Sequence, residues 1–372
     1  MASRVGAFAL VALWLLLELT LHGAAEPLVP AVFVFGDSTV DVGNNNYIEK
    51  CKIDCRADYP HFGVDYPDQA PTGRFSNGYN LADQLAQLLG FAESPAPFLS
   101  LPNASLVPQV STGINFASGG SGLLDDTGNG HCGEVLSMTE QVGNFTNLAR
   151  LWKSENQTAA DLVSKSLFFI SAGSNDLFEY TDAPPVPNRN GTEFLQRLVA
   201  SYTAYLKDLY GAGAKKFSVV SPSLLGCCPS QRLVAQDRKD VDKYGCFGSA
   251  NNLSNQLYPM IASMLHDLSL ELPGMNYSLV DSIRMVEWVF HSPSAPSYNF
   301  TVLDTACCGD GRFGAGGCNF SAPLCQNRAN HLFWDDYHPT DAASGVAAKM
   351  IFGDAGIFVH PINVQQLVAS RP

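Results

Sequence analysis

Residues 31–38 read Ala-Val-Phe-Val-Phe-Gly-Asp-Ser, and this stretch decides how the rest of the chain is interpreted. Its apolar start, rich in Val and Phe, is typical of a strand that is buried on both faces of a parallel sheet. Ligands meet such sheets at the carboxyl ends of the strands. The small residues Gly36, Asp37 and Ser38 would therefore present a serine hydroxyl at that edge. A serine in such a turn is usually structural, so this motif is weak by itself.

Outward from this strand, apolar β-branched runs alternate with amphipathic helical patterns. Further strands are expected at residues 166–171, 216–221 and 277–280. Helices are expected at residues 192–209 and 253–272, and between an N-cap at Asn77 and a closing Gly90. This alternation predicts a parallel sheet with helices on both faces. No repeat or low-complexity linker divides the chain, so we predict one α/β domain over residues 26–372, a three-layer α/β/α sandwich.

The composition excludes several classes of protein. The chain has 372 residues, of which 46% are hydrophobic and 15% charged, a profile of a globular protein rather than a disordered one. The 22 Lys and Arg residues against 35 Asp and Glu residues give a formal charge of −13. A chain this acidic, without a Lys/Arg cluster, would repel a phosphate backbone. Nucleic acid is therefore not an expected partner.

Residues 1–25 have the features of a signal peptide. Arg4 supplies the positive end, residues 5–17 are apolar, and Gly23-Ala24-Ala25 offer small residues for cleavage before Glu26. The apolar run is too short to span a bilayer and is interrupted by Glu18, so an uncleaved anchor is the less favoured alternative. We expect no stable membrane insertion.

The cysteines and the glycosylation sequons also indicate the secretory pathway. All ten Cys follow residue 25, and an even number behind a signal peptide predicts disulfides. Four of them, at 307, 308, 318 and 325, lie in a Gly-rich segment whose spacing matches no common zinc finger and does not reveal the pairing. The Asn-x-Ser/Thr sequons are Asn103, Asn144, Asn156, Asn190, Asn252, Asn276, Asn299 and Asn319. We predict a secreted, extracellular glycoprotein, with Golgi retention as the alternative within the same pathway.

Three further segments carry groups suited to catalysis. Asp335 precedes His338 by three residues and can accept the Nδ1 proton of the ring, which leaves Nε2 to act as a base; the neighbouring Asp336 would point elsewhere. The alternative is that His338 only caps the loop before a helix that starts near Thr340. Asn175, after the strand at 166–171, has an amide that can donate to an oxyanion. The glycines of residues 115–122 allow a backbone N–H to approach a ligand.

Common catalytic signatures are missing from the chain. There is no G-x-S-x-G and no H-E-x-x-H. A G-x-G-x-x-G occurs at Gly309, Gly311 and Gly314, but it lies among cysteines rather than between a strand and a helix, so it does not predict a dinucleotide site.

Taken together, these blocks resemble those of the GDSL esterase/lipase family of SGNH hydrolases, particularly its plant-type secreted branch. The resemblance covers essentially all of the chain after residue 25. Its blocks, in chain order, are FVFGDSTVDVGNNN, RFSNGYNLAD, GINFASGGSG, SAGSND, SPSLLGCCPS and NRANHLFWDDYHPT. The sequence departs from the family's name-giving motif at Thr39, where the family has Leu.

The resemblance implies a fold, a mechanism and site residues. The fold would have a sheet of flavodoxin-like order. Ser38 would be the nucleophile, His338 the general base and acid, and Asp335 its orienting carboxylate. The oxyanion would be bound by the backbone N–H groups of Ser38 and Gly119 and by the Asn175 amide. Ester hydrolysis through an acyl-enzyme would need no metal or organic cofactor.

The choice of substrate stays open at this point. We favour short-acyl or acetyl esters, including those of wall polysaccharides, over long-chain acyl lipids. A noncatalytic extracellular binding or defence protein on the same scaffold is the alternative from another class. The presence of Ser38, Asp335, His338 and Asn175 weighs against it, because binding alone has no chemical need for all four.

Overall fold

The computed structural model describes residues 26–155, 158–184, 189–295 and 298–371. The expected signal peptide and the sequon residue Asn156 lie outside these residues. No helix among the described residues is long and apolar enough to cross a membrane.

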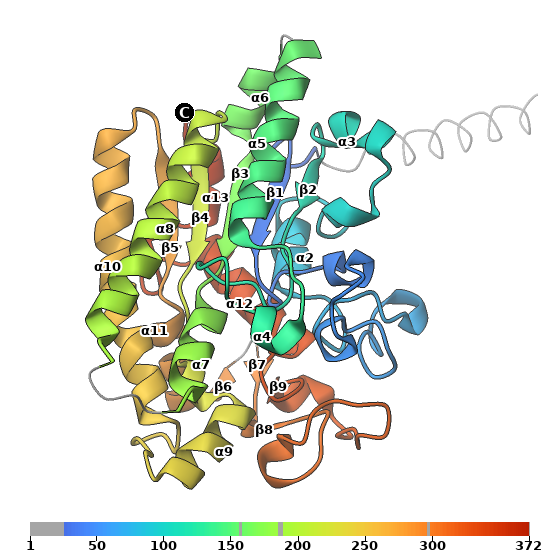
Figure 1. The fold of residues 1–372 in the computed structure, drawn as a ribbon, viewed down its shortest axis with the longest axis vertical. Coiled ribbons are helices and arrows are strands. Elements are labelled where there is room, and N and C mark those ends of the chain that lie inside the picture. Colours follow the sequence, from blue (N-terminus) through green and yellow to red (C-terminus); the bar gives the residue numbers. More distant parts are fainter. Residues whose placement is uncertain (1–25, 156–157, 185–188, 296–297, 372) are drawn as a thin grey trace, which may run out of the picture.

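A six-stranded sheet forms the centre of the fold (Figure 1). Five strands run parallel, in the spatial order β2-β1-β3-β4-β5, and β10 pairs antiparallel with the outer edge of β5. The order of the parallel strands is that of flavodoxin-like sheets, as expected. The strands are β1 (Val32–Gly36), β2 (Gly113–Asn115), β3 (Leu167–Ser171), β4 (Lys216–Val220), β5 (Asn276–Val280) and β10 (Val359–Pro361).

Each central strand sends alternate side chains into two different cores. In β1, Phe33 and Phe35 join one hydrophobic cluster, whereas Val32 and Val34 join the other. Long helices cover the first face: α5 (Met138–Glu155), α8 (Gly191–Gly211) and α10 (Gly248–Glu271). The opposite face is covered by α2 (Leu81–Leu88), α12 (Asp341–Gly353) and α13 (Val364–Ala369), behind the sheet in Figure 1. The predicted three-layer α/β/α sandwich is confirmed.

Shorter elements connect these layers. The remaining helices are α3 (Asn103–Gln109), α4 (Asn129–Cys132), α6 (Ala159–Lys165), α7 (Ser174–Asp182), α9 (Pro229–Arg238) and α11 (Ser282–His291). The remaining strands are β6 (Ser294–Ala295), β7 (Tyr298–Asn299), β8 (Val302–Ala306) and β9 (His331–Phe333).

The cap of α2 differs from the sequence prediction. Asn80, not Asn77, caps the helix: its side chain accepts from the backbone of Ala82 and Asp83, and Asp83 accepts from the Asn80 N–H in return. Asn80 is the N-cap because Asp83, three residues later, completes a capping box with it. Asn77 instead accepts from the backbone N–H of Asp341 and so ties this loop to the start of α12.

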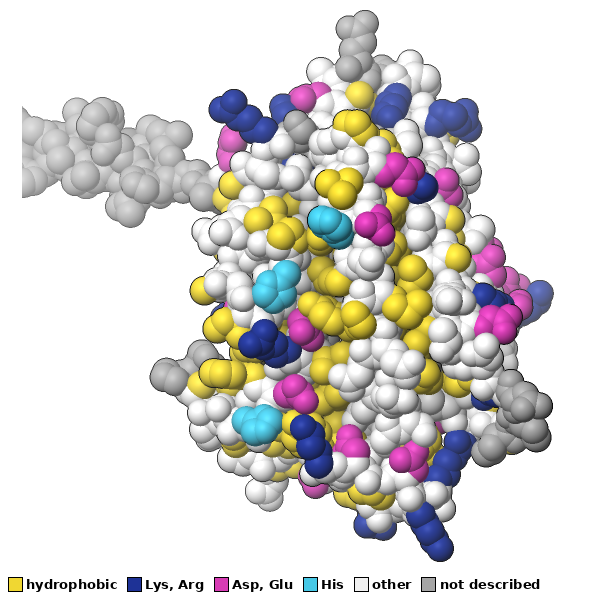
Figure 2. All heavy atoms as spheres, turned by 90° about the vertical axis from the view of Figure 1, so that its left-hand side faces the viewer, with side chains coloured by type: hydrophobic (Ala, Val, Ile, Leu, Met, Phe, Trp, Pro, Cys, Tyr) yellow, Lys and Arg dark blue, Asp and Glu magenta, His cyan; other side chains and the backbone are white. Residues whose placement is uncertain are grey.

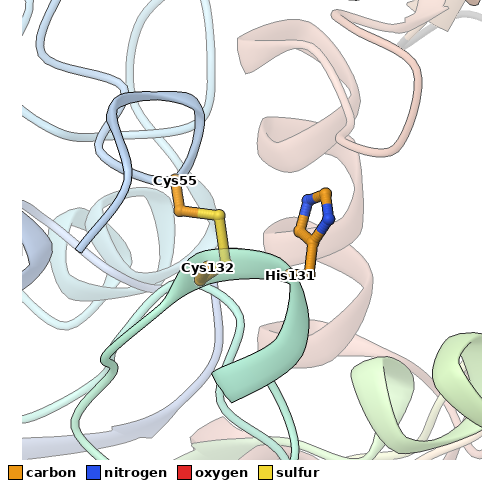
Figure 3. A group of neighbouring side chains, drawn as sticks. All are labelled: Cys55, His131 and Cys132. Atoms are coloured by element: carbon orange, nitrogen blue, oxygen red, sulfur yellow. A yellow bond between two sulfur atoms is a disulfide. The ribbon is translucent and has the colours of Figure 1, made fainter. Parts of the chain in front are cut away.

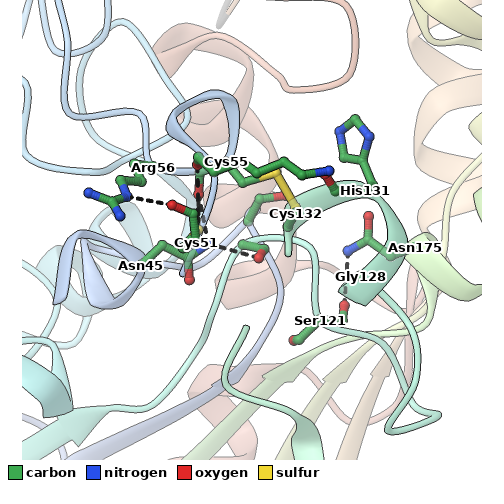
Figure 4. The surroundings of a disulfide bond; sticks show 12 residues. Asn45, Cys51, Cys55, Arg56, Ser121, Gly128, His131, Cys132 and Asn175 are labelled. Carbon is green, nitrogen blue, oxygen red and sulfur yellow. Dashed lines mark hydrogen bonds between the residues drawn. A yellow bond between two sulfur atoms is a disulfide. The ribbon is translucent and has the colours of Figure 1, made fainter. Parts of the chain in front are cut away.

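Four disulfides join cysteines of the loops. They are Cys55–Cys132, Cys227–Cys246, Cys307–Cys325 and Cys308–Cys318, while Cys51 and Cys228 are buried thiols. Cys51 lies beside the first disulfide, and its carbonyl accepts from Arg56 (Figure 4). His131 stands next to the same disulfide (Figure 3). The two clusters of described residues with metal-like spacing both contain a disulfide, whose sulfur atoms are not thiolate ligands.

The described sequon residues lie at or near the surface. Five are exposed and Asn144 and Asn276 are half-buried, the exposed ones being Asn103, Asn190, Asn252, Asn299 and Asn319. On the face shown in Figure 2, Lys and Arg side chains are scattered among Asp and Glu, and hydrophobic side chains form a band along the middle. No basic patch appears on this face.

Candidate active site

The site lies at the carboxyl edge of the sheet, where the chain leaves β1 and β3. Ser38 follows β1, and Asn175 is in the first turn of α7, which follows β3. A side chain at Gly36 is impossible here, because a Cβ would lie 1.8 Å from the carbonyl oxygen of Ser171 and φ is +135°. The turn after β1 therefore packs directly on β3 and holds Ser38 beside the start of α7.

Ser38, His338 and Asp335 form one hydrogen-bonded chain. The Ser38 Oγ lies 2.7 Å from His338 Nε2, and His338 Nδ1 lies 2.9 and 2.8 Å from the two oxygens of Asp335. The carboxylate also accepts from the backbone N–H groups of Tyr337 and His338, which fixes it within its own turn. The geometry is that of a nucleophile, a base and an orienting carboxylate.

Two opposing effects set the pKa of His338. Burial of the ring disfavours its charged form and lowers the pKa. The charge and hydrogen bond of Asp335, with smaller contributions from Asp336 and Asp37, outweigh burial, so that the pKa is raised above its ordinary value of 6.5. The imidazole is thereby made a stronger proton acceptor for Ser38.

Donors for an oxyanion surround the Ser38 hydroxyl. Among the described residues, the Ser38 N–H has no acceptor. The Asn175 Nδ2 donates one hydrogen to the Ser121 carbonyl, as Figure 4 shows, which leaves its second hydrogen free. Asn175 also lies at the N-terminal end of α7, where the helix dipole favours negative charge.

The resemblance implied Gly119 as an oxyanion donor, and the structure shows where its N–H is directed. Gly119 lines the cavity beside Ser38, but its N–H donates to Asp41 Oδ2 at 2.9 Å. Gly119 and Gly120 are the two central residues of a turn, which is closed by a hydrogen bond from the Ser121 N–H to the Ser118 carbonyl. The N–H of Gly120, the next residue, has no acceptor in the described part of the chain and also lines the cavity.

Asp41, which the sequence analysis did not single out, binds the turn that carries Gly119. It is fully buried and accepts from the N–H groups of Gly43 and Asn44 as well as Gly119. Burial raises its pKa to about 6, against the effect of these hydrogen bonds. Asn45 continues the network by donating to the Gly119 carbonyl. In the sequence, Asp41 was marked only by its place in FVFGDSTVDVGNNN, one of the blocks that carry the family resemblance.

Two other carboxylates lie near the site, of which Asp176 is buried and Asp336 half-buried. Asp176 accepts from the N–H groups of Leu123 and Leu124 and from the Thr127 hydroxyl, so it anchors the loop after the glycine turn, and burial raises its pKa to about 6. Asp336 does not bond to the His338 ring, but it lines the same cavity. Burial and the neighbouring Asp335 raise its pKa to about 7.

One cavity of about 800 Å³ contains Ser38, His338 and Asn175. Part of its wall is apolar and comes from α11, α12 and the ends of β4 and β5. The acidic residues on its wall are Asp37, Asp54, Glu179, Asp182, Asp335 and Asp336, and no described Lys or Arg lines it. The cavity thus combines an apolar surface with an excess of negative groups.

Comparisons with known proteins identify one family. The profile described as GDSL-like lipase/acylhydrolase matches residues 32–351. A GDSL esterase/lipase of Arabidopsis thaliana is 34% identical over 351 residues, covering 92% of this chain and 90% of the relative. A second from the same plant is 35% identical over 352 residues, covering 92% and 87%. GDSL esterase/lipase 7 of A. thaliana is 33% identical over 356 residues, covering 92% and 93%.

Proposed function

Because the chain belongs to the GDSL-like lipase/acylhydrolase family, and is thus a carboxylic ester hydrolase, we propose that Ser38, His338 and Asp335 are its catalytic triad. The observation that carries this proposal is the unbroken chain of hydrogen bonds from the Ser38 hydroxyl to the Asp335 carboxylate. All three residues open onto one cavity next to unoccupied N–H donors.

The proposed reaction proceeds through an acyl-enzyme. Ser38 Oγ attacks the ester carbonyl while His338 Nε2 takes its proton, and the resulting imidazolium is stabilised by Asp335. The imidazolium then protonates the departing alcohol. In the second half, His338 takes a proton from water, whose oxygen attacks the acyl carbonyl. The bond between the acyl group and Ser38 Oγ then breaks, the imidazolium returns the proton to Ser38 Oγ, and the acid is released. These steps balance without a metal or an organic cofactor.

We assign the oxyanion to the N–H groups of Ser38 and Gly120 and to the free amide hydrogen of Asn175. Gly120 replaces Gly119 in this assignment because the Gly119 N–H already donates to Asp41. Preorganised donors of this kind supply a large part of the rate enhancement of acyl transfer.

We further propose that the enzyme works in the extracellular space. The four disulfides support an oxidising compartment, and the exposed sequon residues are suitably placed for glycans. Acetyl and other short-acyl esters, including those of wall polysaccharides, are candidate substrates. Long-chain acyl esters are the second candidate, favoured by the size of the cavity: a water occupies about 30 Å³, so an acetyl group would fill only a small part of 800 Å³.

The test is hydrolysis of an ester panel by purified protein, from acetate to long acyl chains and including acetylated xylan. Ser38→Ala should abolish turnover while leaving the fold intact. Ser223→Ala is the matched control, because Ser223 lines the same cavity outside the triad. Activity of Ser38→Ala within tenfold of the wild type would remove Ser38 as nucleophile. A folded wild type that hydrolyses no ester would favour the binding protein instead.

A further inference from the structure

We propose that the acyl chain of the substrate lies in a groove between α11 and α12, and that the enzyme prefers esters with acyl chains of about eight carbons. This inference rests on the proposed function of Ser38. It assigns the acyl side of the ester to a defined surface of the cavity, and of the two substrate classes proposed above it favours the longer acyl chains over acetyl esters.

The first wall of the groove is one face of α12. This helix begins directly after His338, with Thr340 as its N-cap. Ala343, Val346, Ala347 and Met350 line the cavity that contains Ser38. Their spacing of three, four and seven residues places them on one side of a helix. From residue 343 to residue 350 the helix rises about 10 Å, at about 1.5 Å per residue.

The second wall is one face of α11, whose lining residues are one, three and four positions apart. Met285, Val286 and Val289 line the cavity opposite α12, and Val220 and Val280, at the ends of β4 and β5, line it as well. Every one of these side chains is apolar. The acidic residues of the cavity come from other elements, so a hydrocarbon chain would meet no charge along this path.

The side chains along the groove belong to two hydrophobic clusters. Val220, Val280 and Met285 belong to one cluster, whereas Val289 and Ala343 belong to the other. Met350 contacts both clusters yet stays only half-buried, like Val346 and Ala347. An apolar ligand in the groove would complete the burial of these side chains.

The length of the groove sets the preferred length of the acyl chain. An extended hydrocarbon chain advances about 1.3 Å per carbon, so about eight carbons span the roughly 10 Å from residue 343 to residue 350. Each buried methylene can raise kcat/KM by up to about fourfold. For the wild type, kcat/KM on p-nitrophenyl esters should therefore rise steeply from acetate to octanoate.

Ala347 is the position at which to test the groove, because its side chain ends at Cβ and leaves space there. Ala347→Phe should place a ring across the path. We expect kcat/KM on p-nitrophenyl octanoate to fall at least tenfold relative to the wild type, with kcat/KM on the acetate within threefold. Lys349→Phe is the matched control: it adds the same ring on the exposed side of α12 and should leave both substrates unchanged.

The outcomes separate the groove from the triad. Wild-type protein without activity on any ester would contradict the proposed function itself. Good acetate activity with no gain toward octanoate, or an equal loss on both esters in folded Ala347→Phe, would overturn the groove alone. Thermal unfolding should be measured for each variant. If Ala347→Phe does not fold, Ala347→Leu and Val286→Phe narrow the same groove, one from each wall. Both variants must then lower the ratio of kcat/KM on octanoate to kcat/KM on acetate.

Discussion

At the scale of single residues, Asp41 links the nucleophile loop to the turn that carries Gly119 and Gly120. Asp41→Asn keeps the shape but replaces one acceptor oxygen by a donor, so that an N–H of Gly119 or of the loop at Gly43 loses its partner. The turn should shift and misplace the Gly120 N–H. We expect kcat on a short ester to fall about tenfold to a hundredfold, with little change in KM and a native circular dichroism spectrum. An effect confined to KM would contradict this positioning role.

Asn175 should act on the transition state alone. Asn175→Ala removes one oxyanion donor, so kcat should fall by about 10² to 10³ with KM nearly unchanged. Ser174→Ala, at the preceding position of α7, is the control and should retain activity. Steady-state kinetics on a soluble acetate ester would decide between this role and a binding role, which would appear in KM.

The pH profile should report the ionisation of His338. Only the neutral ring can take the Ser38 proton, and the carboxylates around it raise its pKa above 6.5. Measured kcat/KM between pH 4 and 9 should therefore rise through one ionisation at or above neutrality. A profile that is flat, or that falls from pH 5 upward in folded protein, would exclude a neutral imidazole as the base.

The sequence predicted that Ser38, Asn175, Asp335 and His338 would share a site, and the structure brings all four into one cavity. The sequence could not show which of Gly119 and Gly120 has a backbone N–H free to bind an oxyanion. Both residues are glycines in one turn, and the Gly119 N–H is occupied by Asp41, which lies 78 positions away. A contact across such a distance leaves no local pattern.

At the scale of elements, two nested disulfides, Cys307–Cys325 and Cys308–Cys318, support β9, the strand that precedes Asp335 and His338. Cys307 and Cys308 donate their N–H groups to the carbonyls of Phe333 and Trp334, directly before Asp335. Replacing Cys307 and Cys325 by Ser should therefore lower kcat as well as stability.

The Cys227–Cys246 pair is the matched control for this prediction. Its sequence separation of 19 is close to the 18 of Cys307–Cys325, so removing either bond should cost a similar free energy of unfolding, about 3 kcal/mol from chain entropy. Chemical denaturation and kinetics should show comparable destabilisation but a larger loss of kcat for the Cys307/Cys325 variant. Equal kcat values would mean that the nested loop does not position Asp335.

Most of the strongly patterned elements were predicted, but the 18-residue helix α5 was not. The strand at residues 216–221 and the helix at residues 192–209 correspond closely to β4 and α8. The edge strands β2 and β10 have only three residues each, too few for a recognisable alternation, and were not predicted. Their existence depends on the neighbouring strands with which they pair.

At the scale of the whole molecule, buried carboxylates should make stability fall as pH rises. The pKa values of Asp41, Asp176 and Asp341 are raised to about 6 and that of Asp336 to about 7, all chiefly by burial. The folded state therefore binds more protons than the unfolded state between about pH 4 and these raised pKa values, and this stabilising contribution is lost as pH rises through 6 to 7.

The melting temperature should accordingly decrease from pH 5 to pH 8, in the direction opposite to activity. His338, with its raised pKa, contributes in the same sense. Differential scanning fluorimetry at low and high salt would test this, because salt screens the repulsion of the −13 surface charge more than it screens buried groups. A melting temperature that increases toward pH 8 would contradict the prediction.

The acidic cavity wall has a consequence for the end of each catalytic cycle. An ester enters the cavity uncharged, but hydrolysis at neutral pH converts its acyl half into an anion. Six acidic residues line the cavity, and no described Lys or Arg among its lining residues offers that anion a partner. Repulsion by these carboxylates opposes the binding of the product anion by the proposed oxyanion donors, so we expect free acid to inhibit only weakly.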